Sequence, residues 1–208
     1  MHNQYEYGRL TPANTALLMV DHQTGISNGV TDLSQIEFRH NVFALAKIAK
    51  LYQLPTIFTT SQADGPNGPL LEGLSAILPQ APIIHRPGEI NAFDHAEFAQ
   101  AVAKTERKKL LIAGVSTEVC VAFAVLSALQ AGYDVYPVID ASGTWNTLVR
   151  DIAVQRMVQA GAKPITWIAA GAELQQDWRQ TTGEGFAEIM AQHSFYGNVI
   201  TSFVHQQK

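Results

Sequence analysis

The chain has 208 residues, of which 47% are hydrophobic and 15% are charged, and its formal net charge is -4 at pH 7. This length suits one domain with a sizeable core, so we treat residues 1–208 as a single domain. The net negative charge argues against binding of nucleic acid or of an acidic membrane surface. The low fraction of charged residues leaves much apolar surface to cover, which favours a homo-oligomer.

Cys120 is the only cysteine in the chain. It therefore cannot form an intrachain disulfide, and a metal site built from several thiolates is excluded. The first residues, MHNQYEYGRLTPANTA, lack the pattern of a secretory signal, and no apolar stretch approaches the ~18 residues that a membrane span needs. These features predict a cytoplasmic protein without a membrane segment.

Six short apolar runs rich in β-branched residues alternate with longer segments in which apolar residues recur every three or four positions. Apolar strands that alternate with helices are typical of a parallel sheet covered on both faces. We therefore predict a doubly wound α/β domain with a mostly parallel, six-stranded sheet. The runs are residues 16–20, 55–60, 81–85, 109–115, 134–139 and 163–168, and the helical segments are 44–52, 95–105, 117–133 and 146–161.

The sequence also contains signals for where helices begin and end. Thr117 is placed to cap the helical segment that follows it, whereas Gly132 and Gly161 are placed to end two helices. From about residue 170 onward, the sequence predicts helix and loop that pack on the body of the protein or on a neighbouring subunit.

Ligands of open α/β sheets bind beyond the carboxyl ends of the strands, so the residues that follow the apolar runs are the candidates for a site. A carboxylate, a permanent cation and a thiol occur among them. These residues are Asp21, His22 and Gln23, then Ser61 and Gln62, then Arg86, then segments 116–120 and 140–142.

Cys120 falls in the first turn of a predicted helix, where free N–H groups and the helix dipole favour a thiolate. A nearby Arg86 would lower the pKa of this thiol further, and Asp21 could accept its proton and later pass it to a leaving group. Each residue also has a structural interpretation: Cys120 as a buried core thiol, Asp21 as a carboxylate that caps a loop, and Arg86 as a partner in an ion pair. Their joint placement on one rim favours the catalytic interpretation.

Other catalytic patterns are missing from the sequence. His22 and His85 adjoin candidate residues, but neighbours along an extended chain point to opposite sides, so we do not expect a Cys-His pair. The sequence contains no Gly-rich phosphate loop, no G-x-S-x-G turn and no H-E-x-x-H helix. Phosphate transfer and serine hydrolysis are therefore disfavoured.

Six separate stretches, in the right order, match the motifs of a known family. They are LLMVDHQTG (17–25), LPTIFTTS (54–61), GPNGPL (65–70), RPGEINAF (86–93), IAGVSTEVCVAF (112–123) and DASGTWN (140–146). In these stretches the sequence resembles the isochorismatase-like cysteine hydrolases, and within them the YcaC-like group, from Ala16 to the C-terminal region.

The resemblance implies a three-layer α/β/α fold and a catalytic triad of Asp21, Arg86 and Cys120. It also implies a non-proline cis peptide between Val115 and Ser116, which would aim the N–H groups of Ser116 and Cys120 at an oxyanion. The implied reaction is hydrolysis of an amide-type C–N bond in a small molecule through a thioester, without a cofactor. The implied assembly is a homo-oligomer, such as an octamer of stacked rings.

The chain departs from the family pattern in two places. Many relatives have Lys at the position of Arg86, and because Arg cannot shuttle a proton, we expect it only to stabilise the thiolate and oxyanion electrostatically. The nicotinamidase branch binds a metal through an Asp and paired His after the second strand, where this chain has Asp64 and no histidine, so no metal is expected. The candidate substrate-binding residues, which flank the triad in sequence, are Gln23, Asn91, Phe93 and Thr117.

Two alternatives to this reaction stay open. The first is an isochorismatase-type hydrolysis of a vinyl ether, which needs Asp21 but not the thiol. The second is a non-catalytic, thiol-bearing oligomeric protein whose pocket binds a ligand, with Cys120 open to reversible oxidation.

Overall fold

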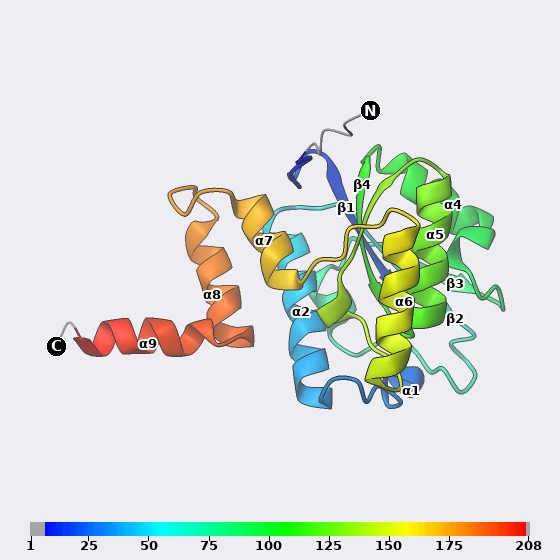
Figure 1. Cartoon of the computed structure of the whole chain (residues 1–208), viewed down its shortest axis with the longest axis horizontal. Helices are drawn as coiled ribbons and strands as arrows, with labels where there is room; N and C mark the ends of the chain where they lie inside the picture. The colour runs from blue at the N-terminus through cyan, green and yellow to red at the C-terminus, as the bar shows by residue number, and fades with distance from the viewer. Residues whose placement is uncertain (1–6, 207–208) are drawn as a thin grey trace.

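A computed structural model describes residues 7–206. Within these residues a parallel sheet of five strands has the order β3-β2-β1-β4-β5 (Figure 1). The interior strands β1 and β4 are buried along their whole length, which explains why their sequences are apolar throughout. The strands are β1 (Thr15–Val20), β2 (Thr56–Ser61), β3 (Ile83–Arg86), β4 (Lys109–Gly114) and β5 (Asp134–Pro137).

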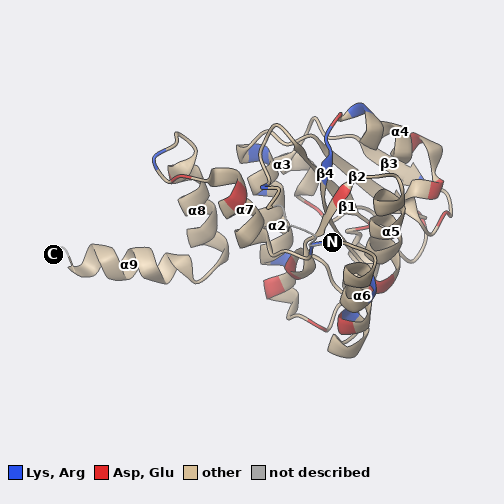
Figure 2. Cartoon of the chain, turned by 45° about the horizontal axis from the view of Figure 1, so that its top comes forward, with Lys and Arg blue, Asp and Glu red and all other residues tan. Residues whose placement is uncertain are grey.

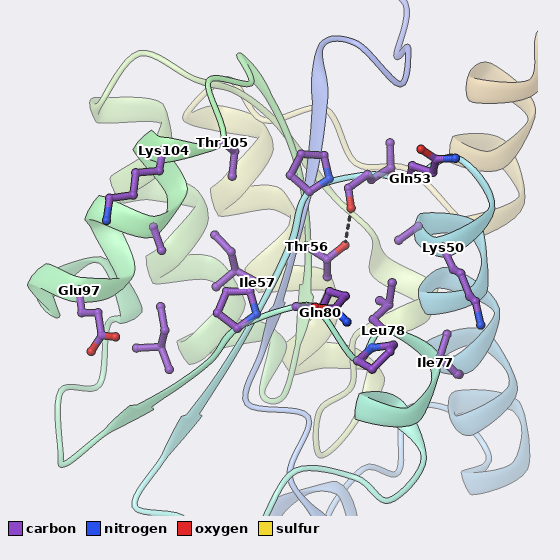
Figure 3. Close-up of a pocket in the computed structure, with 18 of the residues that line it drawn as sticks. Lys50, Gln53, Thr56, Ile57, Ile77, Leu78, Gln80, Glu97, Lys104 and Thr105 are labelled. Atoms are coloured by element: carbon purple, nitrogen blue, oxygen red, sulfur yellow. Dashed lines mark hydrogen bonds between the residues drawn. The ribbon is translucent and has the colours of Figure 1, made fainter.

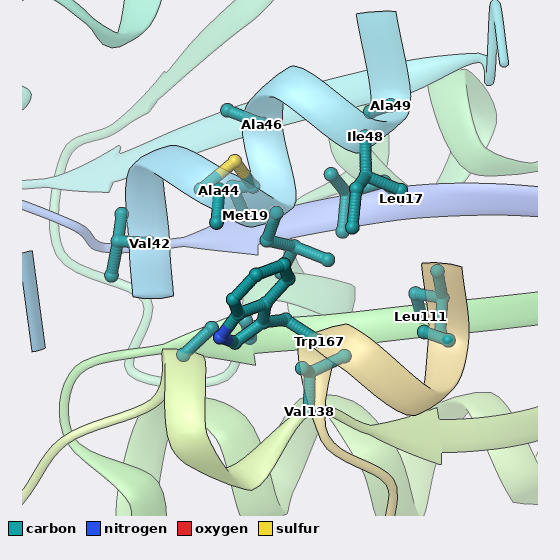
Figure 4. Close-up of a cluster of buried hydrophobic side chains, with 14 of the residues drawn as sticks. Leu17, Met19, Val42, Ala44, Ala46, Ile48, Ala49, Leu111, Val138 and Trp167 are labelled. Carbon is teal, nitrogen blue, oxygen red and sulfur yellow. The ribbon is translucent and has the colours of Figure 1, made fainter. Parts of the chain in front are cut away.

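Helices cover both faces of the sheet, so the predicted three-layer α/β/α fold is confirmed (Figure 1). Leu17 and Met19 of β1 point into one hydrophobic core, which surrounds the indole of Trp167 (Figure 4). Leu18 and Val20, which alternate with them, point into the core on the other face. The first core is covered by α2 (Gln35–Leu51) and α7 (Trp167–Gln175), and the second by α4 (Ala96–Lys104), α5 (Ala122–Gln130) and α6 (Thr147–Gln159).

Shorter elements connect these layers at both edges of the sheet. They are α1 (Thr24–Ser27), α3 (Leu74–Ile77), the 3-10 turns η1 (Ala92–Asp94) and η3 (Ile139–Ala141), and the single π turn η2 (Thr117–Val121).

The register of β1 and β4 places their carboxyl ends side by side. Val20 lies opposite Gly114, and the N–H of Val115 donates to the carbonyl oxygen of Val20 at 3.1 Å. A Cβ atom on Gly114 would lie only 2.1 Å from that carbonyl oxygen, so this close approach requires glycine. As a result, Asp21 and the segment after β4 leave the sheet at the same edge.

The prediction of a sixth strand at residues 163–168 is wrong. The N–H groups of Lys163 and Ile165 donate to carbonyl oxygens of β5, at Val135 and Pro137. Only one bridge forms, between Ile165 and Val138, so residues 163–168 do not make a strand. Thr166 already caps the start of α7, so the pairing with β5 ends after Ile165. The second half of the run is apolar because Trp167 begins a buried helix.

The predicted helix ends are partly confirmed. Gly132 and Gly161 follow α5 and α6 with φ angles of 84° and 103°, as expected for glycines that end helices. The predicted cap at Thr117 is wrong, because its buried hydroxyl has no hydrogen-bond partner among the described residues. Residues 117–121 form the π turn η2 instead, and the α-helix begins only at Ala122.

The chain ends in two helices, α8 (Gly183–His193) and α9 (Tyr196–Gln206), which we call the C-terminal arm. Helix α8 packs against α2, as predicted for a tail that covers the body. Helix α9 projects away from the sheet and has no buried residue (Figure 1). Among residues 7–206, no helix combines the length and apolar character needed to cross a bilayer.

Candidate active site

Asp21, Arg86 and Cys120 come from three different strands and meet at the carboxyl edge of the sheet. Asp21 follows β1, Arg86 is the last residue of β3, and Cys120 lies in η2 after β4. One terminal nitrogen of Arg86, Nη2, donates to both carboxylate oxygens of Asp21, with 2.5 Å to Oδ1. The thiol of Cys120 is hydrogen-bonded to the same carboxylate. The structure therefore brings the three predicted residues into contact.

Every N–H group of the Arg86 guanidinium has a partner inside the protein. Nε donates to the hydroxyl of Thr59 at 3.0 Å, and Nη1 donates to the carbonyl oxygens of Glu89 and Ile90. The two remaining N–H groups point to Asp21. Because a guanidinium has five N–H groups, none is left for an oxyanion in this arrangement. The charge of Arg86 can therefore reach a reacting group only through space or through Asp21.

Asp21 is held in an environment that favours a protonated carboxyl group. Its side chain is 1% exposed, and burial raises its pKa more than the ion pair and hydrogen bond with Arg86 lower it. Its backbone has a φ of 56°, in the left-handed region, and its N–H donates to the carbonyl oxygen of Thr59 at 3.0 Å. A strained, non-glycine residue at a strand end is a common feature of functional sites.

The sequence-based expectation of a lowered thiol pKa at Cys120 is wrong. Burial raises the pKa of this thiol, and the negative charge of Asp21 and their hydrogen bond raise it further. The N–H of Ser116 and the charge of Arg86 lower it by less. Cys120 also precedes the first turn of α5, so the dipole of that helix is not aimed at it as predicted. The resting sulfur is therefore a thiol that donates to a carboxylate.

The turn that carries the sulfur leaves β4 through a cis peptide bond between Val115 and Ser116, the bond named from the sequence. The N–H of Ser116 is directed at the sulfur of Cys120. The N–H of Thr117 is used elsewhere, since it donates to the carbonyl oxygen of Gly143 at 3.0 Å. The turn is thus tied to the segment after β5, and an N–H group stands beside the sulfur of Cys120.

The structure gives Gln23 and Thr117 buried positions. The amide nitrogen of Gln23 donates to the carbonyl oxygens of Ser61 and Gly68, and its oxygen accepts the N–H of Ser61 at 2.8 Å. This amide therefore ties the loop after β2 to the end of that strand. Thr117 is 0% exposed and lies in the turn itself. A direct substrate contact by either residue stays a prediction.

Asn91 and Phe93 lie next to the site, on the turn η1. The side-chain oxygen of Asn91 accepts the N–H of Phe93 at 3.2 Å, and its amide nitrogen donates to Ser127 of α5 at 2.9 Å. The half-buried ring of Phe93 packs edge-on against Phe98, in the hydrophobic cluster against which Cys120 also packs. Asn91 therefore holds the turn, and a substrate contact by either residue stays a prediction.

Neither neighbouring histidine joins the triad. His22 is fully buried, its Nε2 lies 2.9 Å from the carbonyl oxygen of Ala141, and burial lowers its pKa to about 4, so it is neutral at pH 7. His85 is exposed and pairs with the hydroxyl of Thr60 at 2.7 Å. Within residues 7–206, no three histidine, cysteine, aspartate or glutamate side chains are grouped so that they could hold a metal ion.

The fold and the site define an α/β/α domain with a thiol and a carboxylate in contact at the carboxyl edge of a parallel sheet. The model of the isochorismatase domain matches residues 15–169, which contain all five strands and the three site residues. The chain belongs to the isochorismatase family.

Two relatives match the chain over nearly its whole length. It is 48% identical to the probable hydrolase YcaC of Escherichia coli, with 95% of each chain covered. The crystal structure of E. coli YcaC, described as an octameric hydrolase of unknown specificity, has a TM-score of 0.94 over 97% of this chain and 99% of that one. YcaC of Pseudomonas aeruginosa, solved with hexane-2,5-diol and covalent acrylamide, has 52% identity and a TM-score of 0.93 over 96% and 98% of the two chains.

Proposed function

We propose that this protein is a cysteine hydrolase that cleaves an amide-type C–N bond of a small molecule. The observation that carries the proposal is the contact between the thiol of Cys120 and the carboxylate of Asp21, which Arg86 holds through two hydrogen bonds. A buried carboxylate with a raised pKa is a suitable proton acceptor and donor near neutral pH. A thiol is the nucleophile that such a base can activate.

The first half of the reaction forms a thioester. Asp21 takes the proton from the thiol as the sulfur attacks the carbonyl carbon and a C–S bond forms. The carbonyl oxygen becomes an oxyanion, which accepts hydrogen bonds from the N–H groups of Ser116 and Cys120. The C–N bond then breaks, and Asp21 returns the proton to the departing nitrogen, which leaves as ammonia or an amine.

The second half of the reaction restores the enzyme. Water gives a proton to Asp21 and its oxygen attacks the thioester carbon. The C–S bond breaks, the acid product leaves, and the sulfur recovers its proton from Asp21. Arg86 keeps the carboxylate in one orientation through both halves, because Arg86 itself stays charged.

One of the relatives supports this chemistry. YcaC of P. aeruginosa, 52% identical to this chain, carries covalent acrylamide. Acrylamide is a small amide with an electrophilic double bond, and thiolates are the protein nucleophiles that react with it most readily. We therefore expect the pocket of this chain to admit small amides.

The test is turnover of a panel of small primary and substituted amides, followed by ammonia or amine release. Wild-type protein should hydrolyse at least one of them, and Cys120→Ser and Asp21→Asn should each reduce the rate by roughly 10³-fold or more. Asp64→Asn, which changes an exposed carboxylate of the nearby loop, is the matched control and should retain full activity. Mass spectrometry of quenched reactions should show the acyl group on Cys120. Full activity of Cys120→Ser would contradict the proposal.

The same variants separate the two alternatives. Hydrolysis of a vinyl ether that survives Cys120→Ala but not Asp21→Asn would favour the isochorismatase-type reaction. Reversible oxidation of Cys120 without turnover of any amide would favour a thiol-bearing binding protein.

We also infer that the chain forms a homo-oligomer, with an octamer as the expected state because E. coli YcaC is described as octameric. A reducing compartment, such as the cytoplasm, suits a protein whose only cysteine is a nucleophile. The mass of the purified protein in solution tests the first inference.

A further inference from the structure

Helix α9 carries an apolar stripe that no other part of residues 7–206 covers. No residue of this 11-residue helix is buried, and the ring of Phe203 is 60% exposed. Isolated helices of this length are marginal in water, so a partner surface on the exposed side of α9 would stabilise it. The spacing of three and four residues is typical of a helix that docks into a groove. We call Val199, Ile200, Phe203 and Val204 the α9 stripe.

The composition of α9 indicates the chemistry of its partner. The helix contains no Lys, Arg, Asp or Glu, and Figure 2 shows it as a continuous tan segment. A surface that binds anionic lipids or nucleic acid would carry basic residues. The α9 stripe therefore suits an uncharged protein surface. The start of helix α9 is held in place, because Tyr196 stacks on Trp178 at 6.3 Å between ring centroids.

The same chain has an open apolar groove of about 970 Å³ at the opposite edge of the sheet from Cys120, between the end of α2, α3, α4 and the amino ends of β2 and β3 (Figure 3). We call it the α2–α4 groove. Lys50 and Lys104 stand at its rim (Figure 3). Its apolar lining includes Leu54, Ile57, Leu78, Pro82, Ile84 and Ala101.

We propose that the α9 stripe of one copy docks into the α2–α4 groove of a second copy of this chain. Helix α9 points away from the sheet, whereas the groove lies at the strands β2 and β3, so a copy does not fill its own groove (Figure 1). The two surfaces match in chemistry, since both are apolar.

This contact joins two different surfaces, so it runs head to tail, and it closes into a ring where the rotation between neighbouring copies allows. One 11-residue helix, ~16 Å long, covers much less than the ~800 Å² per partner of a standard interface. In a ring each copy donates one arm and receives another, which doubles the contact for each subunit. The octameric YcaC of E. coli, 99% of whose chain is covered by this one, has an assembly size that closed rings can produce.

Light scattering after size-exclusion chromatography tests both surfaces with matched variants. Phe203→Asp puts a charge in the stripe, and Thr201→Asp puts the same charge on the other side of α9. Ala101→Arg puts a charge into the groove, and Ala103→Arg puts it on an exposed position of the same helix. We expect a smaller assembly for the first and third variants and the wild-type mass for the two controls.

Mixing the disrupted variants identifies the head-to-tail contact. Phe203→Asp keeps an intact groove and Ala101→Arg keeps an intact arm, so the two variants should bind each other. Fluorescently labelled Ala101→Arg should therefore have a higher sedimentation coefficient with excess Phe203→Asp, which would also show that both single variants are folded. Excess of the double variant, which carries Phe203→Asp and Ala101→Arg together, should leave the sedimentation coefficient unchanged. An unchanged mass for Phe203→Asp, or for Ala101→Arg, overturns the proposal. Association with the double variant also overturns it, because some other surface would then join the copies.

Discussion

Thr59 contacts both members of the buried ion pair. Its hydroxyl accepts the Nε–H of Arg86 at 3.0 Å, and its carbonyl oxygen accepts the backbone N–H of Asp21, also at 3.0 Å. Thr59 belongs to β2, which lies between the strands that carry Asp21 and Arg86. One residue of the sheet therefore sets the relative position of a carboxylate and the guanidinium that orients it.

Replacing Thr59 by Val should impair activity without removing a catalytic group. The side chain keeps its shape, but the buried Nε–H of Arg86 loses its acceptor, which costs about 1–3 kcal/mol of folding free energy. We expect kcat on the amide substrate to fall by roughly 10-fold, about the effect of ~1.4 kcal/mol in the barrier, with little change in KM. Thr59→Ser restores the hydroxyl and should restore kcat.

The matched control for this prediction is Thr60→Val on the same strand. The hydroxyl of Thr60 pairs with the exposed His85, whose ring can bond to water instead. Steady-state kinetics and urea unfolding of the three variants provide the measurement. Equal losses of kcat in Thr59→Val and Thr60→Val would show that the positioning role is wrong.

The thiol of Cys120 should titrate above the ordinary cysteine pKa of ~8.5. Burial and the Asp21 charge raise its pKa, whereas the charge of Arg86 lowers it. Asp21→Asn should therefore shift the pH profile of alkylation to lower pH, and Arg86→Gln should shift it to higher pH. The measurement is the rate of iodoacetamide modification against pH in the three proteins. Shifts of the same sign in both variants would contradict this account of the site.

Asp140 allows a test of folding stability rather than of activity. Its carboxylate accepts the N–H of Trp167 at 2.9 Å, and burial, with a smaller effect from Glu37, raises its pKa to about 6. The folded state therefore binds this proton more tightly than the unfolded state, whose pKa is near 3.8. The resulting stability is fully present below pH 3.8 and is lost as the pH rises through about 6.

Asp140→Asn keeps an acceptor for Trp167 but removes the charge. At pH 7 the variant should be more stable than wild type by up to about 3 kcal/mol, and the difference should vanish near pH 4. Urea unfolding from pH 4 to pH 7 measures it, and the comparison with wild type cancels the opposing titrations of Asp21 and His22. A constant difference across this range would mean that the carboxylate is not destabilised by burial.

Most of the fold could be predicted from the sequence, because the interior strands are buried on both faces and are therefore apolar throughout. The same pattern failed at residues 163–168, where the apolar character comes from Trp167 in a buried helix. Period alone does not separate a short buried strand from the start of a buried helix. The available signal was Thr166, a residue type that caps helices, directly before Trp167.

The residues that meet at the site were predicted from the sequence, but the pKa of the thiol was not. Asp21, Arg86 and Cys120 could be named because each follows a strand and matches a family motif. The pKa of the thiol could not be predicted, because the burial of the sulfur and its closeness to Asp21, which raise that pKa, are not written in the local sequence. Thr59 was missed for a similar reason, since nothing in PTIFTT distinguishes a threonine that bonds Arg86 from one that only packs.

Two glycines should respond very differently to alanine. At Gly114 a Cβ atom would lie 2.1 Å from the carbonyl oxygen of Val20, so β1 and β4 must separate where they present Asp21 and the cysteine turn. At Gly132 a Cβ atom meets nothing within 4 Å, and only the φ of 84° is unfavourable, which costs about 1–2 kcal/mol. We expect Gly132→Ala to lower the free energy of unfolding by about this amount and to keep full activity. Gly114→Ala should lose more stability than Gly132→Ala and nearly all turnover, as measured by thermal unfolding and amide hydrolysis. An active Gly114→Ala would show that the spacing of these strands does not control the site.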